Sequence, residues 1–331
     1  MAYAVISDIH SNKEALEAVL EDIKDKNISE IICLGDIVGY GADPAVCCEL
    51  VNKHCNSVMG NHDAYIANIF IKKIINEKPS IKEWLKQKIK PVDTKREFGR
   101  LFRGMPNHFV YWSIQINYSL MKDKHKRFIA RLPLEITKEN AILSHQSPGT
   151  DLYDYKREKK GIRQAKYADY ILSPGDYFSE EAETIQKDGL IHGILKQEHA
   201  RSAAYALSSI QQSKKEIGIM GHSHVASYIA YLKNQKINDD ELTAVFIQKN
   251  MDNTDTNSKG CFEMELNPDN VYILNPGAVG QPRDGDLRAS YLIIDENKVA
   301  WHRIPYDAET TRDKILQARI YPGFGDRLVK K

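Results

Sequence analysis

The stretch YAVISDIHSNKEALEAVLEDIKDKNISEIICLGD, residues 3–36, contains two short apolar runs on either side of an amphipathic segment. The runs at 3–7 and 30–34 are too short for helices and rich in β-branched residues, so they predict buried strands. The segment between them keeps apolar residues at helical spacing, namely Leu16, Val19, Leu20 and Ile23. A second, shorter helix is expected over 43–54, where Pro44 suits a first helical turn. This β-α-β-α order predicts a parallel sheet covered by helices.

Polar residues follow five short apolar runs of this kind along the chain. In order, these residues are Asp8 and His10, then Asp36, then Asn61, His62 and Asp63, then His145, and finally His222 and His224. Loops at the carboxyl ends of parallel strands converge on one crevice, and ligands bind there. A lone His-x-His pair is more often a turn that faces water. Because His222 and His224 follow the fifth such strand, we expect them in a shared site instead.

The residue types at these strand ends indicate a metal site. Carboxylate, amide and imidazole groups without thiolate suit borderline divalent ions such as Mn, Fe, Zn, Co or Ni. There are more of these groups than one tetrahedral ion needs, so two ions that share a bridging carboxylate fit better. Two such ions can hold a hydroxide and clamp both oxygens of an in-line phosphoryl displacement.

The bulk composition is that of a globular protein. The chain has 331 residues, with 46 basic and 45 acidic side chains, and this near balance weighs against nucleic acid as a partner. No apolar run approaches the roughly 20 residues that span a bilayer, and the N-terminus lacks the features of a signal peptide. The five cysteines are odd in number and show no CxxC spacing, so they read as free thiols. We expect a soluble cytoplasmic protein with no membrane partner.

The rest of the chain divides into less familiar segments. Residues 67–125 and 151–215 read as helical insertions within a single domain that covers 1–331. From 225 onward, consecutive β-rich runs with short turns predict antiparallel strands and a second sheet or flank.

The motifs DIH (8–10), GDIVGYG (35–41), GNHD (60–63), LSH (143–145) and GHSH (221–224), in this order, resemble the calcineurin-like metallophosphoesterase superfamily. The late segment NPGAVGQPRDGDLRASY (275–291) is similar to its bacterial and archaeal phosphodiesterase branch. The resemblance implies an α/β fold, a four-layer αββα sandwich of two mixed β-sheets flanked by helices. It also implies a binuclear metal centre, with Mn as the first expectation and Fe, Zn, Ni or Co as alternatives.

The resemblance further implies a role for each motif residue. One ion would be held by Asp8, His10, Asp36 and His224. The other would be held by Asp36, Asn61, His145 and His222, so that Asp36 bridges the two. His62 resembles the family histidine that protonates the leaving oxygen or steadies the phosphate. Asp63 would orient its imidazole, and the alternative for Asp63 is an acid at a helix N-terminus.

Two features depart from the family pattern or stay open. Gln146 stands where the family usually has glycine, and its side chain could narrow access or touch the substrate. Arg283 is either a phosphate contact or a structural residue paired with Asp284 or Asp286. The function implied is a metal-dependent phosphoesterase that acts on a small phosphorylated substrate, either a phosphodiester or a phosphomonoester. The alternatives are a non-catalytic scaffold on the same fold, or a nuclease.

Overall fold

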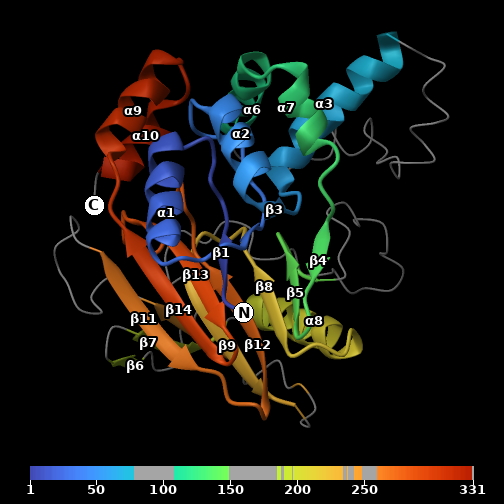
Figure 1. Cartoon of the computed structure of the whole chain (residues 1–331), viewed down its shortest axis with the longest axis vertical. Helices are drawn as coiled ribbons and strands as arrows, with labels where there is room; N and C mark the ends of the chain where they lie inside the picture. The colour runs from blue at the N-terminus through green and yellow to red at the C-terminus, as the bar shows by residue number, and fades with distance from the viewer. Residues whose placement is uncertain are drawn as a thin grey trace.

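The computed structural model describes residues 1–77, 108–148, 185–187, 190–195, 197–233, 237, 242–247 and 259–329. Within these ranges the strands form two mixed sheets, one of six strands and one of eight. Figure 1 shows the strands of both sheets in the lower part of the view, with most of the helices above them. The two mixed sheets and their flanking helices confirm the predicted α/β fold class.

The six-stranded sheet contains the first strands of the chain. Its members are β1 (Tyr3–Ile6), β2 (Ile31–Cys33), β3 (Asn56–Ser57), β11 (Gly260–Glu265), β13 (Ala289–Asp295) and β14 (Lys298–Ile304). Their order is β11-β14-β13-β1-β2-β3. The strands β1, β2 and β3 run parallel, as the opening sequence predicts, whereas β13, β14 and β11 add an antiparallel flank.

The eight-stranded sheet supplies the other half of the sandwich. Its members are β4 (Glu135–Thr137), β5 (Ala141–Ser144), β6 (Ile185–Lys187), β7 (Leu190–Ile194), β8 (Ile217–Met220), β9 (Ala226–Leu232), β10 (Thr243–Ile247) and β12 (Asn270–Pro276). Their order is β4-β5-β8-β12-β9-β10-β7-β6. The central strands β5, β8 and β12 are parallel, and the outer ones pair antiparallel.

Helices cover the outer faces of both sheets. They are α1 (Lys13–Asp25), α2 (Pro44–His54), α3 (Asn61–Glu77), α6 (His108–Leu120), α7 (Asp123–Ile129), α8 (Gln197–Gln212), α9 (Ala308–Gln317) and α10 (Pro322–Val329). The start of α1 is fixed by Asn12, whose side-chain oxygen accepts a hydrogen bond from the backbone N–H of Ala15 at 3.1 Å. As predicted, α2 starts with Pro44 in its first turn.

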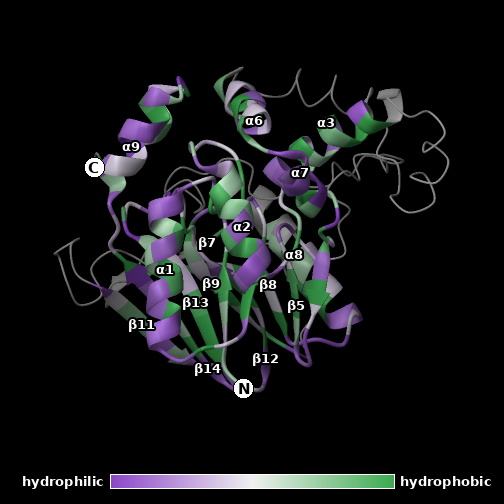
Figure 2. Cartoon of the chain, turned by 45° about the horizontal axis from the view of Figure 1, so that its top comes forward, coloured by the Kyte–Doolittle hydropathy of each residue, from purple (hydrophilic) through white to green (hydrophobic). Residues whose placement is uncertain are grey.

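Three apolar cores separate the layers, because the strands are buried on both faces. In β1, Val5 belongs to the core between the two sheets, whereas Ala4 and Ile6 belong to the core beneath α1 and α2. A third core joins the eight-stranded sheet to α8. Figure 2 shows the resulting pattern, with hydrophobic strands inside and hydrophilic residues on the outer sides of α1 and α9. The layers therefore follow the order helix, sheet, sheet, helix.

The predicted helical insertion over 151–215 needs a correction. Within its described part, α8 is helical, but residues 185–187 and 190–194 form the strands β6 and β7. The segment LIHGI contains Gly193, which disfavours a helix, and β10 offers its edge for antiparallel pairing. Helices α3 and α6 occupy the described part of 67–125. Residues 78–107 and 149–184 lie outside the described ranges, and the single domain over 1–331 stays a prediction.

No helix among the described residues combines the length and apolar character needed to cross a bilayer.

Candidate metal centre

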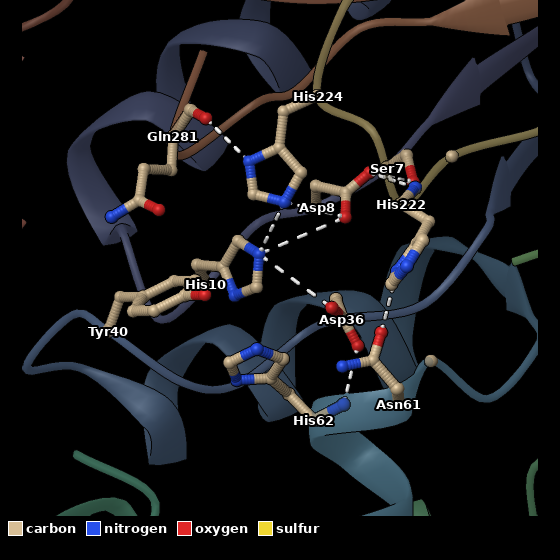
Figure 3. A network of polar contacts seen from close by, with 12 residues as sticks. Ser7, Asp8, His10, Asp36, Tyr40, Asn61, His62, His222, His224 and Gln281 are labelled. Carbon is tan, nitrogen blue, oxygen red and sulfur yellow. Dashed lines mark hydrogen bonds and ion pairs between the residues drawn. The ribbon is translucent and has the colours of Figure 1, made fainter. Parts of the chain in front are cut away.

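The predicted site residues come together at the carboxyl ends of parallel strands from both sheets. Asp8 and His10 follow β1, Asp36 follows β2, and the turn after β3 leads into α3 with Asn61 and His62. From the other sheet, His145 follows β5, while His222 and His224 occupy the turn between β8 and β9. Figure 3 shows side chains from these separate elements directed toward one another, and those it labels are Asp8, His10, Asp36, Asn61, His222 and His224. The convergence expected from the strand ends is present.

One group of side chains forms around His10 and His224. The Nδ1 of His10 donates to the carbonyl oxygen of Val38 at 3.1 Å, and the Nδ1 of His224 donates to that of Gln281 at 2.6 Å. A carbonyl oxygen only accepts, so both protons sit on Nδ1 and both Nε2 atoms carry lone pairs. These two Nε2 atoms face one another at 3.0 Å. Burial, reinforced by nearby positive charge, lowers the pKa of both imidazoles and keeps them neutral.

Asp8 completes this group with an oxygen that lacks a hydrogen bond. Its Oδ2 accepts from the hydroxyl of Ser7 at 2.6 Å and from the backbone N–H of His222 at 3.0 Å. Its Oδ1 is buried without a hydrogen-bond partner, 3.2 Å from the Nε2 of His224 and 3.8 Å from that of His10. Two lone pairs and an anionic oxygen that point at one another repel unless a cation lies between them. This donor set therefore fits a divalent metal ion.

A second group forms around the side-chain oxygen of Asn61. That oxygen lies 3.0 Å from the Nε2 of His145 and 2.9 Å from the Nδ1 of His222. The opposite nitrogen of His145, Nδ1, donates to the carbonyl oxygen of Leu34 at 2.9 Å. Such a bond from the far ring nitrogen to a backbone carbonyl is the usual support of a metal-ligating histidine. Asp36, His145 and His222 accordingly have donor atoms close enough to hold one ion.

Asp36 connects the two groups. Its Oδ2 lies 3.7 Å from the Nε2 of His10 and 3.4 Å from the Nε2 of His145, while its Oδ1 accepts from the backbone N–H of His62 at 2.7 Å. Burial opposes ionisation of Asp36, but the charge of His145 holds its pKa well below the usual range. Conversely, burial lowers the pKa of His145, yet the charge of Asp36 raises it to about 9. The electrostatics of this region favour bound positive charge.

The backbone of these loops adopts an unusual conformation. Five of the predicted ligands have positive φ angles between 50° and 66°, and these are Asp8, His10, Asp36, His222 and His224. Left-handed backbone costs an L-residue roughly 1–2 kcal/mol, and Asp, Asn and His tolerate it better than other non-glycine residues. Such strain persists only where the surroundings determine the conformation, and it is typical of functional sites.

His62 lies beside the two groups, in a cluster of aromatic rings. The ring centroids of His10, Tyr40 and His62 are 4.5–4.7 Å from one another. The Nδ1 of His62 is buried without a hydrogen-bond partner and rests on Gly39, where an added Cβ would come within 2.2 Å of it. Gly39 has φ +104°, so only glycine allows this approach. Burial lowers the pKa of His62 to about 4.

The prediction that Asp63 orients the imidazole of His62 is wrong. Its Oδ1 accepts from the backbone N–H groups of Ile37 and Val38 at 3.0 and 3.3 Å, and its Oδ2 accepts from that of Gly60 at 3.0 Å. Asp63 is the third residue of α3, so the bond to Gly60 is half of a capping box. The alternative, a helix N-terminal acid, describes it better. Burial, together with the charge of Asp36, raises the pKa of Asp63 to about 7.

We expect Asp63→Ala to lower the free energy of unfolding of the metal-free protein by about 3 kcal/mol, because three buried backbone donors lose their acceptor. Denaturant titration measures this loss. The control is Asp313→Ala on α9, an exposed aspartate, which should change stability by less than about 0.5 kcal/mol. Equal stability of the two variants would contradict the structural role of Asp63.

Arg283 lines an open pocket together with residues of both groups. The structural alternative, a pair with Asp284 or Asp286, is not formed. Asp284 pairs with Arg303 at 2.6 Å, and Asp286 pairs with Arg288 at 2.6 Å. The guanidinium of Arg283 donates from Nη2 to the hydroxyl of Tyr40 at 3.3 Å.

Some contributors to the site escaped the sequence analysis. Tyr40 lies within the motif GDIVGYG, so its position beside Asp36 was a usable signal. The carbonyl groups of Leu34, Val38 and Gln281 carry no signal, because every residue type has one. The side chain of Gln146 is not among the described residues that line the pocket, and the residue uses its carbonyl oxygen to accept from the hydroxyl of Ser144.

Comparisons with known proteins agree with this architecture. A sequence model described as calcineurin-like phosphoesterase matches residues 1–226. The chain is 30% identical to the uncharacterized protein MJ0912 of Methanocaldococcus jannaschii, over 98% of this chain and 96% of that protein.

Two crystal structures share the fold. One is a metallophosphoesterase from Sphaerobacter thermophilus, with a TM-score of 0.63 and 23% identity over 99% of this chain and 98% of that one. The other is the hypothetical protein PH1004 from Pyrococcus horikoshii, with a TM-score of 0.58 and 12% identity over 99% and 97% of the two chains. The family model covers more than half of the chain, and the relative from Methanocaldococcus matches nearly all of it. This protein therefore belongs to the calcineurin-like phosphoesterase family.

Proposed function

We propose that this protein is a metal-dependent phosphoesterase with two divalent ions, and that it hydrolyses a phosphodiester or phosphomonoester. One observation carries the proposal. The neutral Nε2 atoms of His10 and His224 meet at 3.0 Å beside the unpartnered Oδ1 of Asp8, which leaves a buried position suited only to a cation. A second set of donors lies on the other side of Asp36. Two sets that share one carboxylate are the arrangement expected of a paired site.

The ligand assignment follows the two groups of side chains. Asp8, His10, Asp36 and His224 would hold one ion, and Asp36, Asn61, His145 and His222 would hold the other. Ions in such a pair supply Lewis acidity to a phosphoryl oxygen and lower the pKa of water. Imidazole, carboxylate and amide donors without thiolate suit Mn, Fe, Zn, Ni or Co, and the family resemblance makes manganese our first choice.

The side chains that do not bind metal act on the substrate. His62 lines the pocket and has no hydrogen-bond partner at Nδ1. Its ring lies beside Asp36, where it can donate a proton to the departing oxygen of the ester. Burial favours its neutral form, and the negative charge of a bound phosphate opposes this effect and favours the protonated acid.

The substrate that we propose is a small phosphorylated molecule. The pocket is open to solvent and lined by polar and charged side chains, among them Asp36, His62 and Arg283, which suits a phosphoryl group. We also propose a cytoplasmic location. All five cysteines lie in the described part of the chain, and their thiols are free there, which fits a reducing compartment.

Metal analysis tests the ligand assignment. The purified protein should bind up to two transition-metal ions per chain. His224→Ala and His145→Ala should each retain about one ion, because each removes a ligand from only one set. Elemental analysis after dialysis gives the stoichiometry. Loss of neither ion from either variant would contradict the two ligand sets.

Activity is tested with phosphomonoesters, phosphodiesters and nucleotides in the presence of Mn. At least one class should be hydrolysed, and a chelator should remove the activity until Mn is returned. Full activity in excess chelator, with no metal found, would exclude the metal-dependent mechanism. A protein that binds both ions and hydrolyses none of these esters would instead support the non-catalytic scaffold, and cleavage of nucleic acid alone would support the nuclease.

A further inference from the structure

Arg283 is a cation without a counter-charge beside the candidate metal centre. Its Nε is buried and makes no hydrogen bond, and its Nη2 makes only long ones, to the hydroxyl of Tyr40 at 3.3 Å and the side-chain oxygen of Gln281 at 3.4 Å. No carboxylate among the described residues forms an ion pair with it. A guanidinium that is partly removed from water in this way is unfavourable unless an anion binds it.

The loop that carries Arg283 is held rigidly next to the site. The backbone N–H of Arg283 donates to the carbonyl oxygen of His224 at 3.1 Å. The next residue, Asp284, is buried, accepts from the backbone N–H of Ala226 at 3.1 Å and pairs with Arg303. Arg283 therefore cannot move far from the pocket without breaking a buried ion pair, and its position is set independently of any substrate.

A second arginine, Arg327 of α10, lies near Tyr40. Tyr40 packs edge-to-face against Phe324 of α10, with 4.6 Å between ring centroids, and the guanidinium of Arg327 lies 5.9 Å from the centroid of Phe324. The guanidinium of Arg283 lies 5.9 Å from the centroid of Tyr40. Each arginine therefore lies over one ring of an edge-to-face pair. Burial and the charge of Arg283 both lower the pKa of Arg327.

Arg327 is also unpaired within the described part of the chain. No described carboxylate forms an ion pair with it, although its neighbour on α10, Asp326, pairs with Arg312 at 3.2 Å. Two like charges held near each other repel, and an anion between them offsets that repulsion. The planar fork of arginine matches the oxygens of a phosphoryl group. The charge of Asp36 does not serve as this anion, because it is committed to the proposed ions.

We propose that Arg283 and Arg327 form an anion subsite on the Tyr40 side of the pocket, which takes a second phosphoryl group of the substrate. This inference rests on the proposed function, since the first phosphoryl group is taken to lie at the metal centre. Arg283 lines the pocket and its backbone contacts His224, whereas Arg327 is reached through the Tyr40–Phe324 pair of rings. The substrate class is then a molecule with two linked phosphoryl groups, such as a nucleoside diphosphate, in preference to a simple monoester.

Two phosphonates distinguish binding at the subsite from binding at the metal centre. Methylenediphosphonate carries two linked phosphoryl-like groups that hydrolases do not cleave, and methylphosphonate carries one. Calorimetric titration of the Mn-loaded protein gives both dissociation constants without turnover, and titration into the Mn-containing dialysate corrects for free ions. We expect the wild-type protein to bind the diphosphonate at least about tenfold more tightly.

Three variants show which arginine causes the difference in affinity between the two phosphonates. Arg327→Gln should weaken diphosphonate binding roughly tenfold and change methylphosphonate binding by less than about twofold, whereas Arg283→Gln should weaken both. Arg327→Lys, which keeps the charge, should lose less than Arg327→Gln. The control Arg312→Gln removes a charge from the neighbouring helix α9 and should change neither constant.

The outcomes are distinguishable from failure of the proposed function. Equal affinity of the wild-type protein for the two phosphonates would overturn the subsite. The subsite would also be overturned if Arg327→Gln and Arg327→Lys each weakened the binding of both phosphonates by the same factor. If the protein hydrolyses no ester but its diphosphonate binding still depends on Arg327, the subsite stands and the phosphoesterase assignment falls. If the protein hydrolyses an ester but does not prefer the diphosphonate, the phosphoesterase assignment stands and the subsite falls.

Discussion

Asp36→Asn should lower kcat/KM by roughly 10³-fold or more, a larger loss than His10→Ala or Asn61→Ala should cause. Asp36 is the only side chain assigned to both ions, and its negative charge is what allows two cations to lie close together. The neutral amide weakens both positions at once. Turnover of the preferred ester and elemental analysis of the dialysed protein measure the two effects.

The isosteric change makes the result interpretable. The side-chain oxygen of asparagine can still accept from the backbone N–H of His62, so the turn into α3 should persist, and circular dichroism checks this. The matched controls are His10→Ala and Asn61→Ala, which each remove a ligand of one ion and should lose less activity. Near-normal turnover and metal content in Asp36→Asn would mean that the bridging assignment is wrong.

His62→Ala should lower turnover by roughly two to four orders of magnitude, the range expected for the loss of a general acid. Its imidazole lines the pocket but is in neither ligand set, so metal content should stay near that of the wild-type protein. The deficit should shrink for a nitrophenyl ester, since a good leaving group needs little protonation as it departs. Turnover of two esters with different leaving-group pKa values measures this.

Each alternative role of His62 has its own signature. A histidine that only steadies the phosphate would produce a similar deficit for both esters, and that result would remove the general-acid assignment. A histidine that binds metal would show lost metal. The control His302→Ala removes another buried imidazole, on β14 and outside the pocket, and reports the general effect of such a cavity on the fold.

The sequence predicted that these polar side chains gather because its signal is local. Each proposed ligand follows a short apolar run, and parallel strands bring the ends of such runs together whatever the rest of the chain does. The role expected for Asp63 came from the family resemblance and not from this local signal, and its hydrogen bonds differ from that expectation. Its partners are the backbone N–H groups of Ile37 and Val38, and these come into reach only through the path of a separate loop.

The parts that were not predicted depend on long-range packing. Tyr40 and Arg283 are hydrogen-bonded although 243 positions separate them, so no pattern in either segment points to the other. The strands β6 and β7 also depend on long-range packing. The sequence LIHGI of β7 has no strong periodicity, and it becomes a strand by pairing with β10. The Arg283 loop carries two arginines and two aspartates close together, so its sequence left open which charges pair. Asp286 pairs with Arg288, whereas Asp284 pairs with Arg303 on β14.

The left-handed backbone at five of the proposed ligands also has a consequence for sequence drift. At these positions the choice of residue is limited twice, first by the donor atom and then by the φ angle, and Asp and His satisfy both. If selection for the donor atom were relaxed, glycine would relieve the strain at each position at little steric cost. A descendant that had lost its chemistry should therefore collect glycine and asparagine at these turns, and its metal-free form should be more stable than that of the present chain.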